Sequence, residues 1–454
     1  MPGSVGGMRR ARAVFALVAL AALPAVASPD IDDPALRTRI ETLDNGLTVL
    51  LLPDATTPAV SFQIWVRAGS KDESSGYTGL AHLFEHMMFR GTNRLAPESH
   101  ERMIEARGGR VNAYTTADNT VFYEDVAPDS LPLVIALEAE RLRNLKITDE
   151  TLASEKQVVL EERRMRTEDS PEGRAFEAML ALAFQAHPYR VPTIGWRSDV
   201  EALTVDACRD FFHTYYAPNN LVVAVAGNFD ADETLANIRE HFGGLEPAAV
   251  TPRRQTVEPE QRGERRAVLH MDVRSPIFAA VWHAPKAGSP DSEALDVASL
   301  VLSGGRSSRL YRKLVYEQQQ ALSAQGGYQE FDEAGLFFAF ASVRPDGDIA
   351  KVERLFLAEI DRLAKELVPA EALAKVKRQI EVDLLSGMET SSEMASRIGG
   401  EYVSFGRIRP IEERLRRYRA VTAADVQRVV RTYLTPENRS VVQVMRPPAA
   451  EAAR

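Results

Sequence analysis

Two histidines four residues apart, with a glutamate directly before the second, are the side chains of this sequence best suited to chemistry. They are His82, Glu85 and His86, in the stretch His-Leu-Phe-Glu-His. Residues at positions i and i+4 of an α-helix lie on one face, so both imidazoles could reach a single ion. A carboxylate beside that ion could take a proton from water, as in zinc peptidases, whose motif is written His-Glu-x-x-His or, as here, in the inverted order. Because five residues also match by chance, the surrounding sequence has to support this interpretation.

A zinc site in a hydrolase usually has three protein ligands and one open position, so a third ligand must lie elsewhere. The candidates are in a charge-rich segment, 149–167, that is predicted to be a helix. Glu155 and Glu162 are seven residues apart, which is two helical turns, so they share one face, whereas Glu161 points elsewhere. Spacing alone leaves two interpretations open, because a helix this rich in charge is more often an ordinary surface helix.

The elements that must position these residues follow from the turn residues and from the spacing of the apolar residues. Asn45-Gly46 between two apolar runs predicts a β-hairpin. Other predicted strands are 47–52, 60–67, 110–115, 120–126 and 221–226, and other predicted helices are 98–107, 130–144 and a histidine-bearing helix that ends near Phe89.

The second half of the chain repeats the pattern of the first. Residues 246–267 are rich in Pro, Glu, Gln and Arg, show no periodicity and are predicted to be a linker. The strand around Phe62 and the strand around Phe278 each lead into a loop of small residues and then into an apolar helix. The second of these helices, 294–302, contains no histidine. This order predicts a duplicated α+β unit with metal chemistry in one copy; the alternative is a coincidental order of elements.

The predicted domains are therefore an N-terminal domain that carries the metal motif, 38–245, and a homologous C-terminal domain without it, 268–445.

Composition limits the class of protein. The chain has 454 residues, of which 45% are hydrophobic and 26% charged, as expected for a globular protein with a large core. The formal net charge is −9 and no basic stripe opposes the acid excess, so a nucleic-acid partner is not expected.

Residues 1–27 are predicted to be a secretory signal peptide. Basic residues from Arg9 to Arg12 precede an apolar run, 13–23, and Ala25-Val26-Ala27 offers the small residues of a cleavage site. The alternative is an uncleaved anchor or an over-long gene start. No later segment approaches the ~20 apolar residues of a membrane span. We therefore expect a periplasmic or secreted protein without a transmembrane helix.

Neither the single cysteine nor the remaining histidines are expected to take part in the chemistry of the site. Cys208 is the single cysteine, which forbids an internal disulfide and indicates a small packing residue. His187, before Pro188-Tyr189, is expected in a structural turn. The remaining histidines show no ligand spacing and are expected at the surface or in satisfied polar sites: His100, His213, His241, His270 and His283.

In this context, the stretch from His82 to His86 resembles the active-site motif of the pitrilysin (insulinase) family of inverted-motif zinc peptidases. The sequence is most similar to the half-size bacterial and mitochondrial-processing-peptidase-like members, and the resemblance covers residues 38–445. Further matching stretches are Gly108–Thr115, His187–Tyr189, Tyr216–Leu221 and Gly304–Leu310.

The resemblance implies the ligands and their roles. The third ligand of the family is a glutamate 76 residues after the second histidine, which is Glu162 here, and the supporting glutamate seven residues earlier is Glu155. His82, His86 and Glu162 would then hold one Zn²⁺. Glu85 would be the general base, and Glu155 would orient a histidine or the bound water.

The resemblance also implies how a peptide binds. Asn112 and Ala113 would belong to an edge strand that receives the substrate by β-augmentation, through main-chain hydrogen bonds. Residue identity alone would make them part of an ordinary strand with a polar edge.

The fold implied is α+β, with two homologous halves, each a mostly antiparallel sheet flanked by helices, that form a clam-shell chamber. The function implied is a zinc-dependent metalloendopeptidase that cleaves short or unstructured peptides. The alternative is a catalytically silent scaffold or assembly subunit that retains the fold.

One part of the family pattern is missing from the second half. Many members have an arginine and a tyrosine there that bind substrate and stabilise the transition state, but Tyr316 and Leu322 stand at those positions. We therefore expect the zinc-bearing subunit of a heterodimer, whose homologous partner supplies the arginine and tyrosine, or a homodimer.

Overall fold

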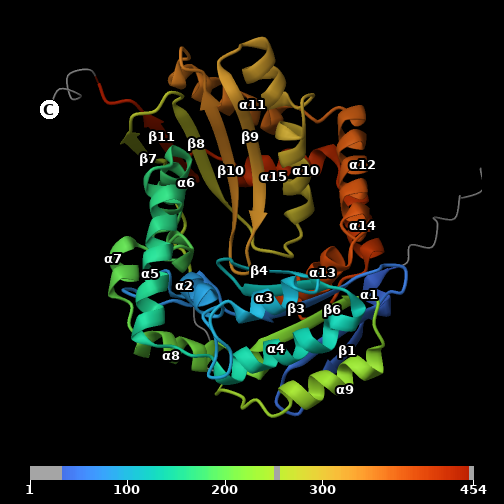
Figure 1. The fold of residues 1–454 in the computed structure, drawn as a ribbon. Coiled ribbons are helices and arrows are strands. Elements are labelled where there is room, and N and C mark those ends of the chain that lie inside the picture. The colour runs from blue at the N-terminus through green and yellow to red at the C-terminus, as the bar shows by residue number, and fades with distance from the viewer. Residues whose placement is uncertain (1–32, 250–255, 449–454) are drawn as a thin grey trace, which may run out of the picture. The chain divides into compact units, whose positions relative to one another are not determined.

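The computed structural model describes residues 33–249 and 256–448, which form two β-sheets flanked by helices (Figure 1). The predicted signal peptide, 1–27, lies outside the described residues, as do residues 250–255 of the predicted linker. The last three residues of that linker, 265–267, begin a strand of the second sheet. The fold is a mixed α+β fold, as the sequence predicts.

The first sheet is built from six strands of the first half: β1 (Arg39–Thr42), β2 (Thr48–Pro53), β3 (Val60–Val66), β4 (Arg110–Thr115), β5 (Thr120–Val126) and β6 (Leu221–Gly227). Their order is β1-β2-β6-β3-β5-β4, so β4 lies at an edge of the sheet. The pair β2–β6 is parallel, and the other neighbouring strands are antiparallel.

The second sheet is built from five strands of the second half: β7 (Arg265–His270), β8 (Ile277–Ala284), β9 (Ala321–Glu330), β10 (Gly335–Val343) and β11 (Arg439–Met445). Their order, β7-β11-β8-β10-β9, repeats the order β2-β6-β3-β5-β4 of the first sheet. The parallel pair is also at the same place, since β7–β11 corresponds to β2–β6. This shared topology confirms the predicted pair of homologous halves, while the exact domain boundaries remain a prediction.

The helices of the first half are α1 (Pro34–Arg37), α2 (Leu80–Met87), α3 (Ser99–Glu105), α4 (Leu131–Asn144), α5 (Asp149–Arg163), α6 (Pro171–Ala183), α7 (Arg197–Ala202), α8 (Val205–Tyr215) and α9 (Ala231–Phe242). Those of the second half are α10 (Ser292–Ser303), α11 (Ile349–Lys365), α12 (Ala370–Ser386), α13 (Ser391–Phe405), α14 (Ile411–Ala420) and α15 (Ala423–Tyr433). Two π-helical turns, η3 (Arg164–Glu168) and η6 (Tyr311–Glu317), and four 3-10 turns, η1 (Ser70–Asp72), η2 (Pro128–Ser130), η4 (Pro188–Arg190) and η5 (Pro218–Asn220), complete the elements.

The two halves exchange a helix. Strand β3 is buried along its whole length because both faces of the first sheet are covered. Phe62 and Ile64 join the core of the first half, whereas Trp65, on the opposite face, packs against α13 from the second half. The approach is so close that a Cβ atom at Gly399 would lie 2.3 Å from the Trp65 indole nitrogen. In return, α6 from the first half packs on β8 and β11 of the second sheet.

Most element predictions are confirmed. The strands 110–115 and 120–126 coincide with β4 and β5, and the Asn45-Gly46 turn joins β1 to β2 with Gly46 at a φ of +87°. The predicted helix 149–167 instead ends at Arg163 and continues as the π-helical turn η3. Cys208 is buried in the core of the first half, as expected for a packing residue.

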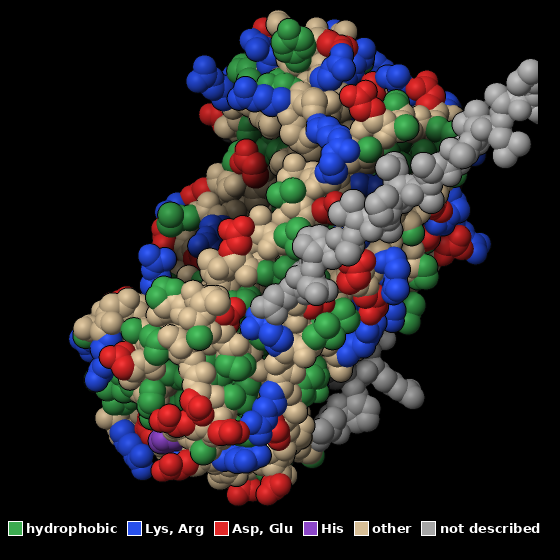
Figure 2. Space-filling model, turned by 90° about the vertical axis from the view of Figure 1, so that its right-hand side faces the viewer, with side chains coloured by type: hydrophobic (Ala, Val, Ile, Leu, Met, Phe, Trp, Pro, Cys, Tyr) green, Lys and Arg blue, Asp and Glu red, His purple; other side chains and the backbone are tan. Residues whose placement is uncertain are grey.

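Acidic and basic side chains are interspersed over the face of the molecule shown in Figure 2. Such residues pair in several places, for example Arg407 with Glu413 and Arg419 with Glu381, both at 2.7 Å. Within residues 33–249 and 256–448, no helix combines the length and apolarity that crossing a membrane requires.

Candidate metal centre

The histidine helix α2 begins at a turn that is fixed by a glycine and by the carboxylate of Glu73. Gly79 precedes the helix with a φ of +86°, and a Cβ atom there would lie 2.7 Å from the Ile194 carbonyl oxygen, so a side chain would be strained and crowded. The carboxylate of Glu73 accepts hydrogen bonds from the backbone N–H groups of Gly79 at 2.9 Å and Ala81 at 2.7 Å. It thereby satisfies donors that have no partner inside the helix.

The two faces of α2 have different surroundings. Leu83, Phe84 and Met87 are fully buried in the core of the first half, where the Phe84 ring lies 4.7 Å from that of Tyr216. The other face carries His82 and His86. Apolar residues at helical spacing therefore anchor the helix and leave the imidazoles facing α5, against which α2 packs.

Helix α5 supplies both glutamates that the sequence indicates. The helix starts at Thr148, whose hydroxyl accepts the backbone N–H of Thr151 at 3.2 Å. Glu155 is buried, and the Glu162 side chain is 16% exposed, so neither belongs to a solvated face. Glu161, by contrast, is 55% exposed, as its position on the helix predicts.

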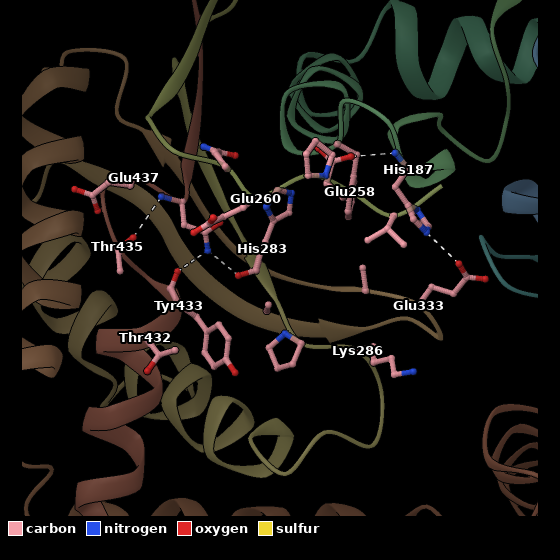
Figure 3. A pocket seen from close by; sticks show the side chains of 18 of the residues that line it. His187, Glu258, Glu260, His283, Lys286, Glu333, Thr432, Tyr433, Thr435 and Glu437 are labelled. Carbon is pink, nitrogen blue, oxygen red and sulfur yellow. Dashed lines mark hydrogen bonds and ion pairs between the residues drawn. The ribbon is translucent and has the colours of Figure 1, made fainter. Parts of the chain in front are cut away.

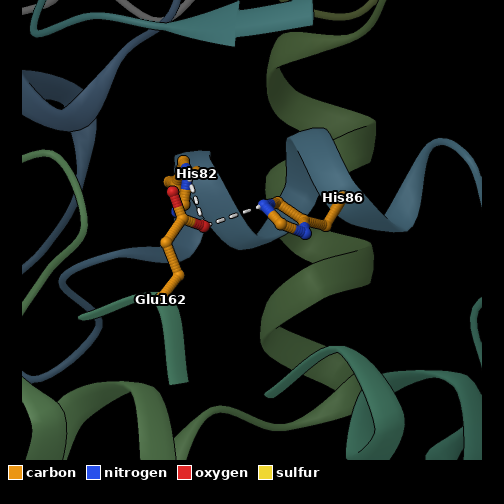
Figure 4. A group of neighbouring side chains, drawn as sticks. All are labelled: His82, His86 and Glu162. Carbon is orange, nitrogen blue, oxygen red and sulfur yellow. Dashed lines mark ion pairs between the residues drawn. The ribbon is translucent and has the colours of Figure 1, made fainter. Parts of the chain in front are cut away.

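Three potential ligand atoms converge in the arrangement shown in Figure 4. Glu162 Oε2 lies 3.7 Å from His82 Nε2 and 3.5 Å from His86 Nε2. Bonds of about 2.0–2.1 Å in a tetrahedron would separate ligand atoms by roughly 3.3 Å. The three side chains therefore fit a zinc ion in donor type and in spacing, with only small shifts.

Further side chains hold these groups. Glu155 Oε2 is 3.4 Å from His86 Nδ1, and its other oxygen is 2.6 Å from Arg90 Nε. An outer carboxylate on the second imidazole nitrogen is a usual feature of metal-binding histidines, because it fixes the ring and its tautomer. Arg166 contacts Glu162 from outside, with Nη1 2.5 Å from Oε1.

The carboxylate of Glu85 is held beside the converging atoms. Thr115, the last residue of β4, donates its hydroxyl to Glu85 Oε2 at 2.6 Å. Burial raises the pKa of Glu85, and the hydrogen bond from Thr115 opposes this rise. A carboxylate with a raised pKa is a better proton acceptor, which suits a general base.

The two imidazoles differ in proton affinity. Burial lowers the pKa of His82 to about 4, assisted by the charge of His86. Burial also acts to lower the pKa of His86, but its hydrogen bonds with Glu155 and Glu162 outweigh this and raise the pKa to about 9. A metal ion would have to displace the His86 proton, so we expect metal binding to weaken as the pH falls.

A cavity of about 540 Å³ opens onto these groups. All the described residues that line it lie between positions 82 and 166, and none comes from the second half. Asn112 and Ala113 line it from the edge strand β4. Tyr316, in η6, and Leu322, in β9, are 74% and 52% exposed and do not line it.

A second group of potential metal ligands is paired with an arginine. His100 Nε2 lies 3.4 Å from Glu124 Oε1 and from Glu138 Oε1 in the core of the first half. Arg141 Nη2 is 2.5 Å from Glu138 Oε1, and Arg141 Nε donates to Glu138 Oε2 at 2.9 Å. The guanidinium supplies the positive charge that an ion would otherwise bring, so we assign this group to structure.

Another cavity, of about 610 Å³, lies between the halves and is lined by residues of α15, β8 and the segment 256–261 (Figure 3). Two of its acidic groups are engaged: Glu258 accepts backbone N–H groups from Gln185, Ala186 and His187, and Glu333 lies 3.2 Å from His187 Nε2. His187 Nδ1 accepts the backbone N–H of Tyr189, which confirms the expected structural turn. Neither potential metal-ligand group among the described residues lies in this cavity.

Several residues of the site have little or no sequence signal. Arg90, Thr115 and Glu73 reach the site through the packing of separate elements. Arg166 is four residues after Glu162, so helical spacing could have placed it beside that carboxylate. His100 was expected at the surface or in a polar site, but its partners Glu124 and Glu138 could not be named because they are distant in sequence.

Two family models match the chain. The family model described as Insulinase (Peptidase family M16) matches residues 48–196, and that described as Peptidase M16 inactive domain matches residues 202–380. The first match contains every residue that lines the cavity.

Two curated proteins align along most of the chain. An uncharacterized zinc protease of Mycobacterium tuberculosis is 31% identical over 413 residues, which cover 90% of this chain and 93% of the relative. A probable mitochondrial-processing peptidase subunit beta of Arabidopsis thaliana is 28% identical, over 90% of this chain and 79% of the relative.

A solved structure has the same fold. The crystal structure of a protease from Helicobacter pylori superposes with a TM-score of 0.87 and 27% sequence identity, over 90% of this chain and 99% of that chain.

Proposed function

Because the chain belongs to the insulinase family of M16 peptidases, we propose that it is a zinc-dependent metalloendopeptidase that cleaves short or unstructured peptides. The observation that carries this proposal is the convergence of His82, His86 and Glu162 within one cavity that also holds Glu85. Relatives named zinc proteases support the choice of metal.

In this proposal, His82, His86 and Glu162 hold one zinc ion, and Glu155 fixes the ring of His86. Zinc bound there supplies Lewis-acid chemistry, since it acidifies water and polarises the carbonyl group of a peptide bond. The set would supply two imidazoles and one carboxylate, and three protein ligands are the usual number for a catalytic rather than a structural zinc site.

Glu85 is proposed to accept a proton from the attacking water molecule and to pass it on. Its Oε2 is engaged by Thr115, so we assign proton acceptance to Oε1. From there, the proton passes to the nitrogen of the leaving amine, and the carboxylate returns to its starting state. The peptide would lie along the edge strand β4, beside Asn112 and Ala113, with its main chain paired to the strand.

We further propose that the active enzyme contains a second chain. The cavity is lined from the first half alone, and Tyr316 and Leu322 occupy the positions where an arginine and a tyrosine are expected. The name of the Arabidopsis relative describes it as one subunit of a processing peptidase. A homologous chain would bring both side chains, and the alternative assembly is a homodimer with a second copy of this chain. Export to the periplasm or outside the cell, through the predicted segment 1–27, belongs to the same proposal.

Peptidase activity of the chain alone and in complex tests this proposal. We expect an unstructured fluorogenic peptide to be cleaved when a homologous chain carrying the missing arginine and tyrosine is co-expressed, and not by either chain alone. Full activity of the purified chain as a monomer would contradict the two-chain enzyme. If zinc is bound and no preparation cleaves any peptide, the alternative of a catalytically silent scaffold replaces the proposal.

A further inference from the structure

The two carboxylate oxygens of Glu162 have different partners. Oε2 faces both imidazoles, at 3.7 Å from His82 and 3.5 Å from His86. Oε1 points the other way and lies 2.5 Å from Arg166 Nη1. One oxygen is thus directed at the ion position, and the other is held by a guanidinium outside it.

The local backbone places Arg166 at this position. Helix α5 ends at Arg163 and continues as the π-helical turn η3, in which Arg166 lines the cavity while its neighbour Arg164 turns away to Glu161 and Asp169. The two arginines therefore form similar pairs with neighbouring glutamates, but only the Arg166 pair includes a proposed metal ligand.

We propose that Arg166 is a positioning residue that holds Glu162 so that Oε2 alone faces the metal. This inference rests on the proposed zinc site. Without Arg166, the carboxylate could rotate about its last bond, and its ordering would oppose metal binding. Arg166 thus acts on Glu162 as Glu155 acts on His86: each fixes one ligand from outside.

Loss of Arg166 would have two opposing effects on zinc binding: Glu162 would no longer be held in place, and a positive charge near the ion position would be removed. An exposed ion pair stabilises a fold very little, and the Arg166 side chain is 76% exposed, so its removal should leave folding unchanged. The positive charge of Arg166 would also repel a cation, but solvent and salt screen an exposed charge strongly. The carboxylate that it holds is only 16% exposed, so orientation dominates.

Zinc affinity tests the inference independently of catalysis. The dissociation constant for zinc is measured by competition with a chromophoric chelator for the wild-type chain, Arg166→Gln, Arg166→Lys and Glu162→Gln. Arg164→Gln is the matched control, because it removes the neighbouring arginine of the same turn. The melting temperature of each metal-free protein verifies folding.

We expect Arg166→Gln to weaken zinc binding by about 10-fold or more, within the range known for outer partners of metal ligands. Arg166→Lys should recover part of the affinity, because it restores the charge without the planar fork of the guanidinium. Arg164→Gln should stay within about twofold of wild type, and melting temperatures should be unchanged.

Three results would overturn the inference: wild-type affinity in Arg166→Gln, tighter binding in Arg166→Gln through lost repulsion, or an equal loss in Arg164→Gln. A failure of the proposed function differs from these. In that case the wild-type chain itself does not bind zinc, or Glu162→Gln binds it equally well, and the inference fails together with the site.

Discussion

Glu85→Gln will bind zinc as the wild type does and will cleave peptides about 100- to 10,000-fold more slowly, the range that a positioned acid–base group contributes. The amide keeps the size of the side chain and can still interact with Thr115, which donates to Glu85 Oε2 at 2.6 Å. It cannot accept a proton. Because Glu85 is not one of the three converging ligands, the affinity for zinc should stay the same. The measurement is kcat on an unstructured peptide in the active assembly, together with zinc content.

Glu101→Gln is the control for this prediction. Glu101 lines the same cavity, and burial raises its pKa, as it does for Glu85, but Glu101 does not belong to the converging ligand group. Its substitution should change kcat by less than about threefold, as for a residue outside the acid–base step. If Glu85→Gln retained most of its turnover, or lost its zinc, the role of Glu85 as the general base would be wrong.

Arg141→Met will destabilise the fold by about 3–5 kcal/mol, the cost of breaking a buried ion pair by removing one partner. Arg141 is 2% exposed and lies against Glu138 and Glu124, which are both fully buried. Methionine replaces the volume but leaves two carboxylates close together without their cation. The free energy of unfolding, from denaturant titration of the metal-free chain, measures this loss.

The destabilisation should grow with pH. Burial raises the pKa of Glu138 to about 8 even with Arg141 present to oppose the rise, and burial also raises the pKa of Glu124. Loss of the guanidinium raises both pKa values further. A carboxyl group whose folded pKa is raised costs stability above its unfolded pKa in both proteins, and the two diverge only above the lower, wild-type folded pKa. The extra loss in the variant should therefore be larger above about pH 8, where Glu138 of the wild type ionises, than at pH 5.

Arg143→Met is the matched control on the same helix. Arg143 is exposed and donates to the His241 carbonyl oxygen, so its replacement should change stability by less than about 1 kcal/mol. Equal stability of the Arg141 and Arg143 variants would show that the buried group does not depend on its arginine.

The sequence predicts local features of the site well because they follow from helical spacing. The i and i+4 positions of His82 and His86 place both rings on one face of α2, and the seven-residue interval places Glu155 and Glu162 on one face of α5. That these two faces meet depends on tertiary packing. Spacing alone could not provide it, and the family resemblance was needed to select Glu162.

Other features could not be predicted because an amphipathic pattern does not identify the element against which a helix packs. The apolar faces of α6 and α13 show that each helix is packed, but not that each covers the sheet of the other half. Likewise, Thr115 ends a predicted strand, and nothing in its sequence neighbourhood indicates a contact with Glu85. The burial of His100 with Glu124 and Glu138 also depends on three separate elements.

The zinc content of the purified chain tests the central claim most directly. Metal analysis after dialysis would compare the wild type with Glu162→Gln and with Glu161→Gln, a control one residue away whose side chain is 55% exposed. We predict one zinc ion per chain in the wild type and in Glu161→Gln, and loss of most of the zinc in Glu162→Gln. A wild-type chain without zinc, or a Glu162→Gln variant that keeps its full zinc content, would contradict the proposed site.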